Sequence, residues 1–187
     1  MDQVKMGTRV TPCPMPVTLV GTKVEGRVNF MAVAWIARVN NKPPIWGAGI
    51  AKRHFTMKGI HENREFSINF PTAEMITETD YCGLGSGSKI DKSDVFDVFY
   101  GALEGAPMIA GCPLAIECRV HDVVDMPTNY LVLGEVVEAY SEERFLTDDR
   151  LDIKKANPVV LTMPDNRYWT VGEHVADAWE AGKYFRP

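Results

Sequence analysis

Residues 29–36 read Asn-Phe-Met-Ala-Val-Ala-Trp-Ile, an apolar run in which two alanines stand among larger side chains. Such a run suits a β-strand, and its small residues let a flat ligand approach the main chain. Further along, residues 80–92 read Asp-Tyr-Cys-Gly-Leu-Gly-Ser-Gly-Ser-Lys-Ile-Asp-Lys, which is a small polar loop. Its amides, hydroxyls and lysines are groups that hold an anion. Their occurrence together, in this order, is the most informative feature of the chain.

The composition is that of a globular protein. The chain has 187 residues, of which 45% are hydrophobic and 24% charged, and this length predicts one domain over residues 1–187. The net charge of −5 argues against general nucleic-acid binding, which needs a basic face. No apolar run approaches the ~20 residues that a membrane helix needs, and the N-terminus has no signal pattern. We therefore expect neither nucleic acid nor membrane as a partner.

Several kinds of chemistry have no support in the sequence. The four cysteines form no Cys-x-x-Cys pair, and they predict free thiols in a cytoplasmic protein: Cys13, Cys82, Cys112 and Cys118. The four histidines have no metal-ligand spacing: His54, His61, His121 and His174. The chain also lacks a Gly-x-Ser-x-Gly elbow, a Walker motif and a dinucleotide Gly-x-Gly-x-x-Gly motif. We expect no metal site and assign no catalytic side chain, and a nicotinamide cofactor would bind without a Rossmann domain.

The pattern along the chain is one of short strands separated by turn residues. Strands are predicted at 16–22, 31–40, 45–50, 65–70, 114–124, 130–140, 159–163 and 167–169, with an exposed charged excursion at 141–158. Helices are predicted at 56–63, after Pro71 with Thr72 as N-cap, and at 171–182, where Val175, Ala178 and Trp179 form one apolar stripe. Many short strands with few helices favour a barrel or a sandwich.

Several short motifs occur in a fixed order along this chain. They are Pro16, Val20 and Thr22; Asn29, Met31, Ala34 and Trp35; Asn-Lys-Pro-Pro at 41–44; Phe-Ser-Ile-Asn-Phe-Pro at 66–71; the loop at 81–92; Gly-Glu-Val at 134–136; and the segment 169–182. Each one alone is ordinary core or loop sequence. In this order, from about Pro16 to Arg186, the chain resembles the flavin reductase-like family.

The resemblance implies a mostly β fold, namely an FMN-binding split β-barrel of the antiparallel Greek-key kind with peripheral α-helices. It also implies FMN as cofactor and a homodimer with the flavin near the subunit interface. The main chain of residues 31–35 would lie against the isoalloxazine ring, while the segment after the third strand and the 86–92 loop would hold the phosphate. The implied cofactor-binding residues are Asn29, Met31, Ala32, Val33, Ala34, Trp35, Lys52, Arg53, His54, Thr56, Asn69, Cys82, Gly83, Ser86, Lys89 and Lys92.

The chain also departs from the family pattern. Family members often have Thr at the positions of Ala32 and Ile36, and they usually have Ser and Arg in the phosphate segment, where this chain has Gly49, Ala51 and His54. Lys52 and Arg53, which stand beside these positions, could substitute for the missing charge.

Three functions follow from the resemblance. The first is an oxidoreductase that passes electrons from NAD(P)H through FMN to an unidentified acceptor. The second is a flavoredoxin-like FMN electron carrier without nicotinamide activity, and the third is a non-catalytic barrel that binds a small molecule. The sequence leaves open which nicotinamide donor is used and whether the flavin stays bound or is exchanged as a substrate.

Overall fold

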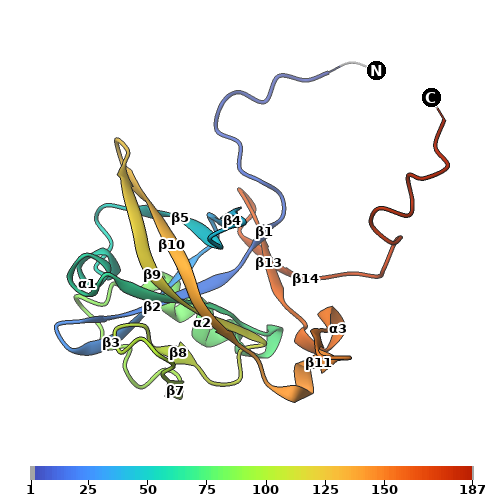
Figure 1. Cartoon of the computed structure of the whole chain (residues 1–187). Helices are drawn as coiled ribbons and strands as arrows, with labels where there is room; N and C mark the ends of the chain where they lie inside the picture. The colour runs from blue at the N-terminus through green and yellow to red at the C-terminus, as the bar shows by residue number, and fades with distance from the viewer. Residues whose placement is uncertain (1–2, 187) are drawn as a thin grey trace.

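A computed structural model describes residues 3–186 (Figure 1). The predicted domain of residues 1–187 includes residues 1, 2 and 187, which lie outside the described residues. The strands are β1 (Met15–Pro16), β2 (Thr18–Val24), β3 (Arg27–Val33), β4 (Ile36–Asn40), β5 (Ile45–Ala51), β6 (Glu65–Phe70), β7 (Val98–Phe99), β8 (Met108–Ile109), β9 (Leu114–Asp125), β10 (Asn129–Tyr140), β11 (Leu146–Thr147), β12 (Arg150–Leu151), β13 (Val159–Thr162) and β14 (Arg167–Thr170). The helices are α1 (Thr56–Asn63), α2 (Ile76–Leu84) and α3 (Ile153–Ala156), with 3₁₀ turns η1 (Ala73–Met75) and η2 (Glu143–Phe145).

The main sheet has seven antiparallel strands in the order β3-β2-β6-β9-β10-β5-β4. Its two edge strands, β3 and β4, follow one another in the chain with only two residues between them. The sheet therefore has to curl until its edges meet at that link, which makes it a barrel that is split along one side. The predicted split β-barrel with peripheral helices is confirmed.

The predicted strand over 31–40 is in fact two strands. β3 ends at Val33 and β4 begins at Ile36, and Ala34 and Trp35 form the corner between them. The corner is fixed to β5, the strand that pairs with β4, because the Gly49 amide donates a hydrogen bond to the Trp35 carbonyl at 2.8 Å. The local sequence is apolar and strand-like throughout, so only the closing of the barrel reveals the break. The other strands from 16–22 to 167–169 are confirmed to within two residues.

The barrel interior is filled by side chains from every strand of the main sheet. The largest fully buried ones include Phe66, Ile50 and Ile68. The predicted helix at 56–63 is confirmed as α1, which lies directly on β2. This contact requires glycine at position 59, because a Cβ there would overlap the Lys23 carbonyl oxygen. Helix α1 is therefore held at a fixed distance from the sheet, which fixes the position of its first turn.

The helix predicted after Pro71 is present as η1 followed by α2, and Thr72 occupies the N-cap position without a side-chain capping hydrogen bond. The excursion at 141–158 contains η2, the β11–β12 hairpin and α3, and it buries Phe145 and Ala156. No helix within residues 3–186 is long and apolar enough to cross a membrane.

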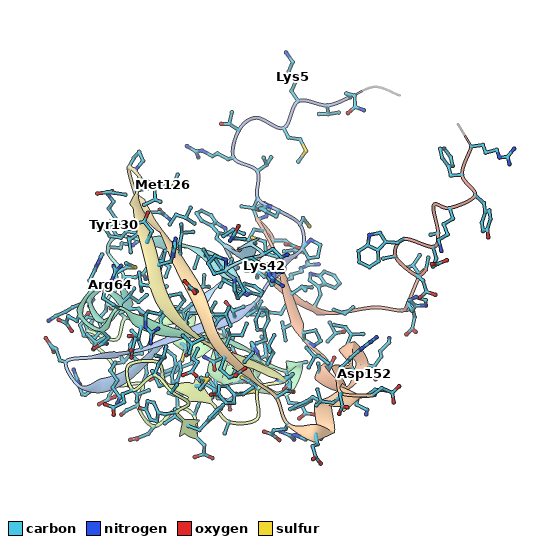
Figure 2. The ribbon with its side chains drawn as sticks, in the orientation of Figure 1. Lys5, Lys42, Arg64, Met126, Tyr130 and Asp152 are labelled. Carbon is cyan, nitrogen blue, oxygen red and sulfur yellow. The ribbon has the colours of Figure 1, made fainter. Side chains whose placement is uncertain are left out.

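The helix predicted at 171–182 is wrong. After β14 the chain runs without regular structure and forms only turns between Asp177 and Phe185. Figure 1 shows this C-terminal segment and the N-terminal segment leaving the barrel as two separate arms, and Figure 2 places Lys5 on the N-terminal arm, away from the body. The stripe of Val175, Ala178 and Trp179 has no surface to pack on within one chain, and a short helix without such packing is marginal.

Candidate functional site

The corner between β3 and β4 opens onto a cavity of about 430 Å³, which we call the large cavity. The end of β3, the corner, the end of β5, the turn after β5, the start of β10 and the β13–β14 turn line it: Met31, Ala32, Val33, Ala34, Trp35, Gly49, Ile50, Ala51, Arg53, His54, Asn129 and Met163. Because β3 is an edge strand, its outer edge forms no ladder with another described strand. The large cavity is therefore bordered by main-chain groups that remain available to a ligand.

A second, much smaller cavity of about 30 Å³ shares Met31, Ala32 and His54 with the large one. We call it the small cavity. The start of α1, the end of α2 and the following loop supply the rest of its lining: Phe55, Thr56, Cys82, Gly83, Gly85, Ser86, Gly87 and Lys92. The two cavities therefore form one site with a broad open part and a narrow polar part.

Lys92 gives the small cavity its charge. Its side chain is buried, with 3% of the residue exposed, and its Nζ donates hydrogen bonds to the Phe30 carbonyl at 3.0 Å and the Cys82 carbonyl at 2.8 Å. Both acceptors are uncharged, so among residues 3–186 no hydrogen-bonded carboxylate balances the ammonium. A buried charge without a counter-ion is costly, and an anion in the small cavity would lower that cost.

The start of α1 also faces the small cavity. Thr56 is the first residue of α1, which has neither a side-chain cap hydrogen bond nor an acidic residue in its first turn. The Thr56 hydroxyl accepts a hydrogen bond from the Asn29 Nδ2 at 2.8 Å, so its own proton remains available to a ligand. The Met57 and Lys58 amides of this turn already donate to the His54 and Phe55 carbonyls, so what this end of α1 offers an anion is chiefly the Thr56 hydroxyl, together with the positive end of the helix dipole.

The pKa values of neighbouring groups agree with a positive local potential. Burial lowers the pKa of His54, and the charges of Arg53 and Lys92 lower it further. Burial also lowers the pKa of the Lys92 ammonium. Burial raises the pKa of the Cys82 thiol to about 11, against the opposing charge of Lys92. His54 and Cys82 are therefore neutral at neutral pH, and Cys82 is not a reactive thiolate.

The loop after α2 is fitted closely to the rest of the site. Gly87 lies so near to Asn29 and Phe55 that a Cβ on it would overlap the Asn29 Oδ1. Asn29 cannot move aside freely, because it is buried and hydrogen-bonded to Thr56. The polar loop predicted from the sequence is therefore held against α1, and its main chain comes close to the small cavity.

The structure brings most of the predicted site residues to the two cavities. These are Met31, Ala32, Val33, Ala34, Trp35, Arg53, His54, Thr56, Cys82, Gly83, Ser86 and Lys92. Asn29 stands behind Thr56 and lines a neighbouring crevice with Lys92. Lys92 does not extend along an exposed loop, as its polar neighbours suggest, but is turned inward onto main-chain carbonyls.

The remaining three predicted residues lie apart from both cavities. Lys52 forms an ion pair with Asp125 and lies over the Tyr130 ring at 5.2 Å, near the tip of the β9–β10 hairpin, which Met126 marks in Figure 2. Lys89 is exposed and is absent from the lining of both cavities. Asn69 is fully buried, and it donates to the Leu19 carbonyl and accepts from the Ile109 amide.

The structure also adds residues that sequence reasoning missed. Asn129 reaches the large cavity because it pairs with Ala51 in the β5–β10 ladder, and Met163 reaches it from the β13–β14 turn. Neither has a local sequence signal, since each depends on pairing between distant segments. Phe55 and Gly87 adjoin predicted residues and could have been included with them. Among residues 3–186, no group of three or more His, Cys, Asp or Glu side chains is placed to hold a metal ion.

Comparison with known proteins identifies related chains of similar fold. Residues 10–157 match the flavin reductase like domain family. A flavoredoxin from Methanosarcina acetivorans is 51% identical, with a TM-score of 0.96 over 98% of each chain. The flavoredoxin of Desulfovibrio vulgaris (Miyazaki F) is 30% identical, with a TM-score of 0.89 over 97% of this chain and 100% of that one.

A third solved structure is an FMN-binding protein from Thermus thermophilus, which is 25% identical with a TM-score of 0.78 over 95% of this chain and 97% of that one. The chain also matches an uncharacterized protein of Aeropyrum pernix, with 28% identity over 71% of this chain. The match spans about half of that protein's length, 51%.

Proposed function

The chain belongs to the flavin reductase-like domain family, and on that premise we propose that it binds FMN and works as a flavin-dependent oxidoreductase. The observation that carries the proposal is the pairing of the two cavities. The large cavity has a size typical of ligand pockets, which are about 300–1,000 Å³, and the adjoining small cavity has positive charge without a counter-ion. A flavin mononucleotide has the matching parts, a broad ring system and one terminal phosphate.

Different residues of this chain would bind the phosphate and the ring of the flavin. Lys92, the Thr56 hydroxyl and the N-terminus of α1 would hold the phosphate, with Ser86 at the outer rim of the small cavity. The main chain of residues 31–35 would border the ring, and Arg53 and Asn129 also line the large cavity. FMN, when bound, supplies the reversible uptake of a hydride or of electrons, and the protein orients it and sets its electrostatic surroundings.

The proposed reaction takes electrons from NAD(P)H and passes them to an acceptor that is not identified. We assign no side chain of the site as an acid or base, because the flavin itself would supply the redox chemistry. One observation favours a second candidate, an FMN electron carrier without nicotinamide activity, because the 51% identical relative is a flavoredoxin. The two candidates share the cofactor and differ in the electron donor.

The first experiment tests flavin binding. Apo-protein is titrated with FMN, FAD and riboflavin, and the quenching of flavin fluorescence is followed. We expect FMN to bind most tightly, because its terminal phosphate matches the unbalanced positive charge of the small cavity, whereas riboflavin lacks a phosphate and the chain has no dinucleotide-binding motif for FAD. Clearly tighter binding of FAD would contradict the proposal, and the absence of any flavin binding would leave a barrel that binds another small molecule.

The second experiment separates the two candidate functions. FMN-loaded protein is mixed with NADH or NADPH without oxygen, and flavin absorbance is recorded. Bleaching at a rate well above that of free FMN is the result expected for the oxidoreductase. Bleaching by a reduced protein donor or dithionite, and not by either nicotinamide, would assign the electron carrier instead.

We also propose a homodimer in the cytoplasm. The four free thiols support the compartment, because disulfides are rare there. If the dimer completes the flavin site, FMN must strengthen dimerisation, because a ligand that binds only the dimer stabilises it by mass action. Sedimentation at falling protein concentration with and without FMN measures this, and a monomer that holds FMN as tightly as the dimer would contradict the shared site.

A further inference from the structure

The C-terminal arm, residues 171–186, exposes large apolar side chains to an unusual degree. Val175, Trp179, Tyr184 and Phe185 are 95%, 91%, 91% and 77% exposed, and every described residue from Met163 onward is exposed. Single apolar residues on a surface are common, but three aromatic side chains on one short arm are not. The arm leaves the barrel (Figure 1), and the described body of the chain leaves these side chains uncovered.

The barrel carries an uncovered apolar surface next to its cofactor site. This apolar groove, of about 470 Å³, lies between the N-terminal arm and strands β4 and β5, and it is lined by Val10, Thr11, Pro12, Met15, Pro16, Ala34, Trp35, Ile36, Ala37 and Gly47. Trp35 is 52% exposed and Val39, which lies against Gly47, is 55% exposed. β4 is an edge strand, so its outer edge forms no ladder with another described strand.

The groove and the arm start from the same small sheet. Met15 and Pro16 form β1, which pairs with β13, and β13 pairs with β14, from which the arm leaves. Two copies related by a two-fold axis near this sheet would each present one groove and one arm to the other. This is the self-complementary arrangement of a closed dimer.

The area is sufficient for a stable contact. An aromatic side chain buries about 150–250 Å², so the three aromatic side chains of the arm would bury about 450–750 Å² and two arms about 900–1,500 Å². The groove residues that the two arms cover would bury a comparable solvent-accessible area. The total reaches the size of stable interfaces, which is about 1,200–2,000 Å².

We propose that the C-terminal arm of a second copy of this chain lies in the apolar groove, and that the exchange is reciprocal. Ala34 and Trp35 line both the groove and the large cavity, so the partner's arm would lie directly behind the corner that borders the cofactor site. The partner copy would thereby fix the wall of the cavity without needing to enter it. The inference rests on the proposed homodimer, and its evidence does not involve FMN.

A cross-linking experiment tests whether the contact is made in trans. In the Cys13→Ser background, in which the other three cysteines are buried, Ala37→Cys in the groove is combined with Ala178→Cys on the arm, and the protein is oxidised. The expected product is a covalent species of twice the 20.9 kDa chain mass, with residues 37 and 178 joined in the peptide map. The matched control combines Ala178→Cys with Ser88→Cys on the distant loop.

Mixing the two single variants decides between trans and cis contact. A disulfide between a chain with Ala37→Cys and a chain with Ala178→Cys supports the exchange, because the link then joins two different chains. A link confined to one chain in the double variant would overturn it, since the arm would then occupy its own groove. Equal cross-linking in the Ser88 control would also overturn it, by showing that the reaction follows random collision.

The second test measures the dimer directly. Trp179→Ala on the arm and Ala37→Glu in the groove should each raise the dimer dissociation constant at least tenfold in sedimentation, while Tyr100→Ala, an exposed aromatic outside both surfaces, should leave it unchanged. Trp179 is 91% exposed, so its loss does not disturb the fold of the single chain. A wild-type protein that stays monomeric at all concentrations, or a dimer indifferent to both variants, would overturn the proposal. Because these measurements use apo-protein, they can succeed while FMN binding fails, and the reverse.

Discussion

Replacement of Lys92 by Met is expected to weaken FMN binding through loss of charge, with little change of shape. Met has a similar length and no charge, so it fills the space that the lysine side chain leaves. A hydrogen bond to a charged group contributes about 1.5–3 kcal/mol, which corresponds to about ten- to a hundredfold in affinity. Two donors of Lys92 already serve the Phe30 and Cys82 carbonyls. We therefore expect a loss of FMN affinity at the lower end of this range, about tenfold.

The substitution also has a structural cost. The two carbonyls each lose a donor, worth about 0.5–1.5 kcal/mol per hydrogen bond, while the cost of burying an unbalanced ammonium disappears. The net loss of unfolding free energy should stay below about 2 kcal/mol, which lowers Tm by at most about 8 °C in a chain of this length. Thermal unfolding of the apo-variant checks that the site is still folded when binding is measured.

Riboflavin, which lacks the phosphate, separates charge from shape. If Lys92 acts on the phosphate, Lys92→Met weakens FMN about tenfold and leaves riboflavin binding almost unchanged. Lys89→Met is the matched control, because Lys89 is an exposed lysine of the same loop that lines neither cavity. An equal loss of FMN and riboflavin affinity would mean that Lys92 only positions the loop, and the small cavity would not be the phosphate site.

Three further predictions concern other parts of the fold. Gly87→Ala should abolish tight FMN binding in a titration while Ser88→Ala retains it, because a Cβ at position 87 overlaps Asn29; equal affinities would refute the close fit. Gly59→Ala should lower the unfolding free energy by about 1–3 kcal/mol in urea denaturation, since α1 would be pushed away from β2, and an unchanged midpoint would contradict the contact. The apo-protein should lose stability as pH falls below about 6.5, because the lowered pKa of His54 means that the unfolded chain binds the proton more readily. His54→Gln should remove that part of the pH dependence, and an identical slope in the variant would assign it to another group.

The strands could be predicted because alternation of side chains depends on nearest neighbours in the chain. In β6, Phe66 and Ile68 point into the barrel core as the pattern predicts. On the other face of β6, the site prediction differs from the structure at Asn69. The family resemblance implies Asn69 as a cofactor-binding residue. The structure instead covers that face with the segment around Pro107 and Ile109, which Ser67 and Asn69 hold by hydrogen bonds.

Two features of the site were beyond local sequence reasoning. The corner at Ala34 and Trp35 exists because the sheet closes, and closure depends on the pairing order of seven strands. The inward direction of Lys92 depends on whether its loop offers buried acceptors, and those acceptors come from Phe30 and from the last turns of α2. The residue types at the site were therefore predictable from the motifs, whereas the way in which Lys92 acts was not.

The missing C-terminal helix shows what a periodic pattern establishes. The spacing of Val175, Ala178 and Trp179 specifies which side of a helix would be apolar, but the free energy of a short helix comes mainly from burying that side. Within one chain these residues stay exposed, and Trp179 has a left-handed backbone conformation with φ of 63°, which no regular helix contains. An apolar stripe without a surface in its own chain indicates a surface in another chain. The same residues that predicted a helix therefore carry the proposal that the arm packs on a second copy.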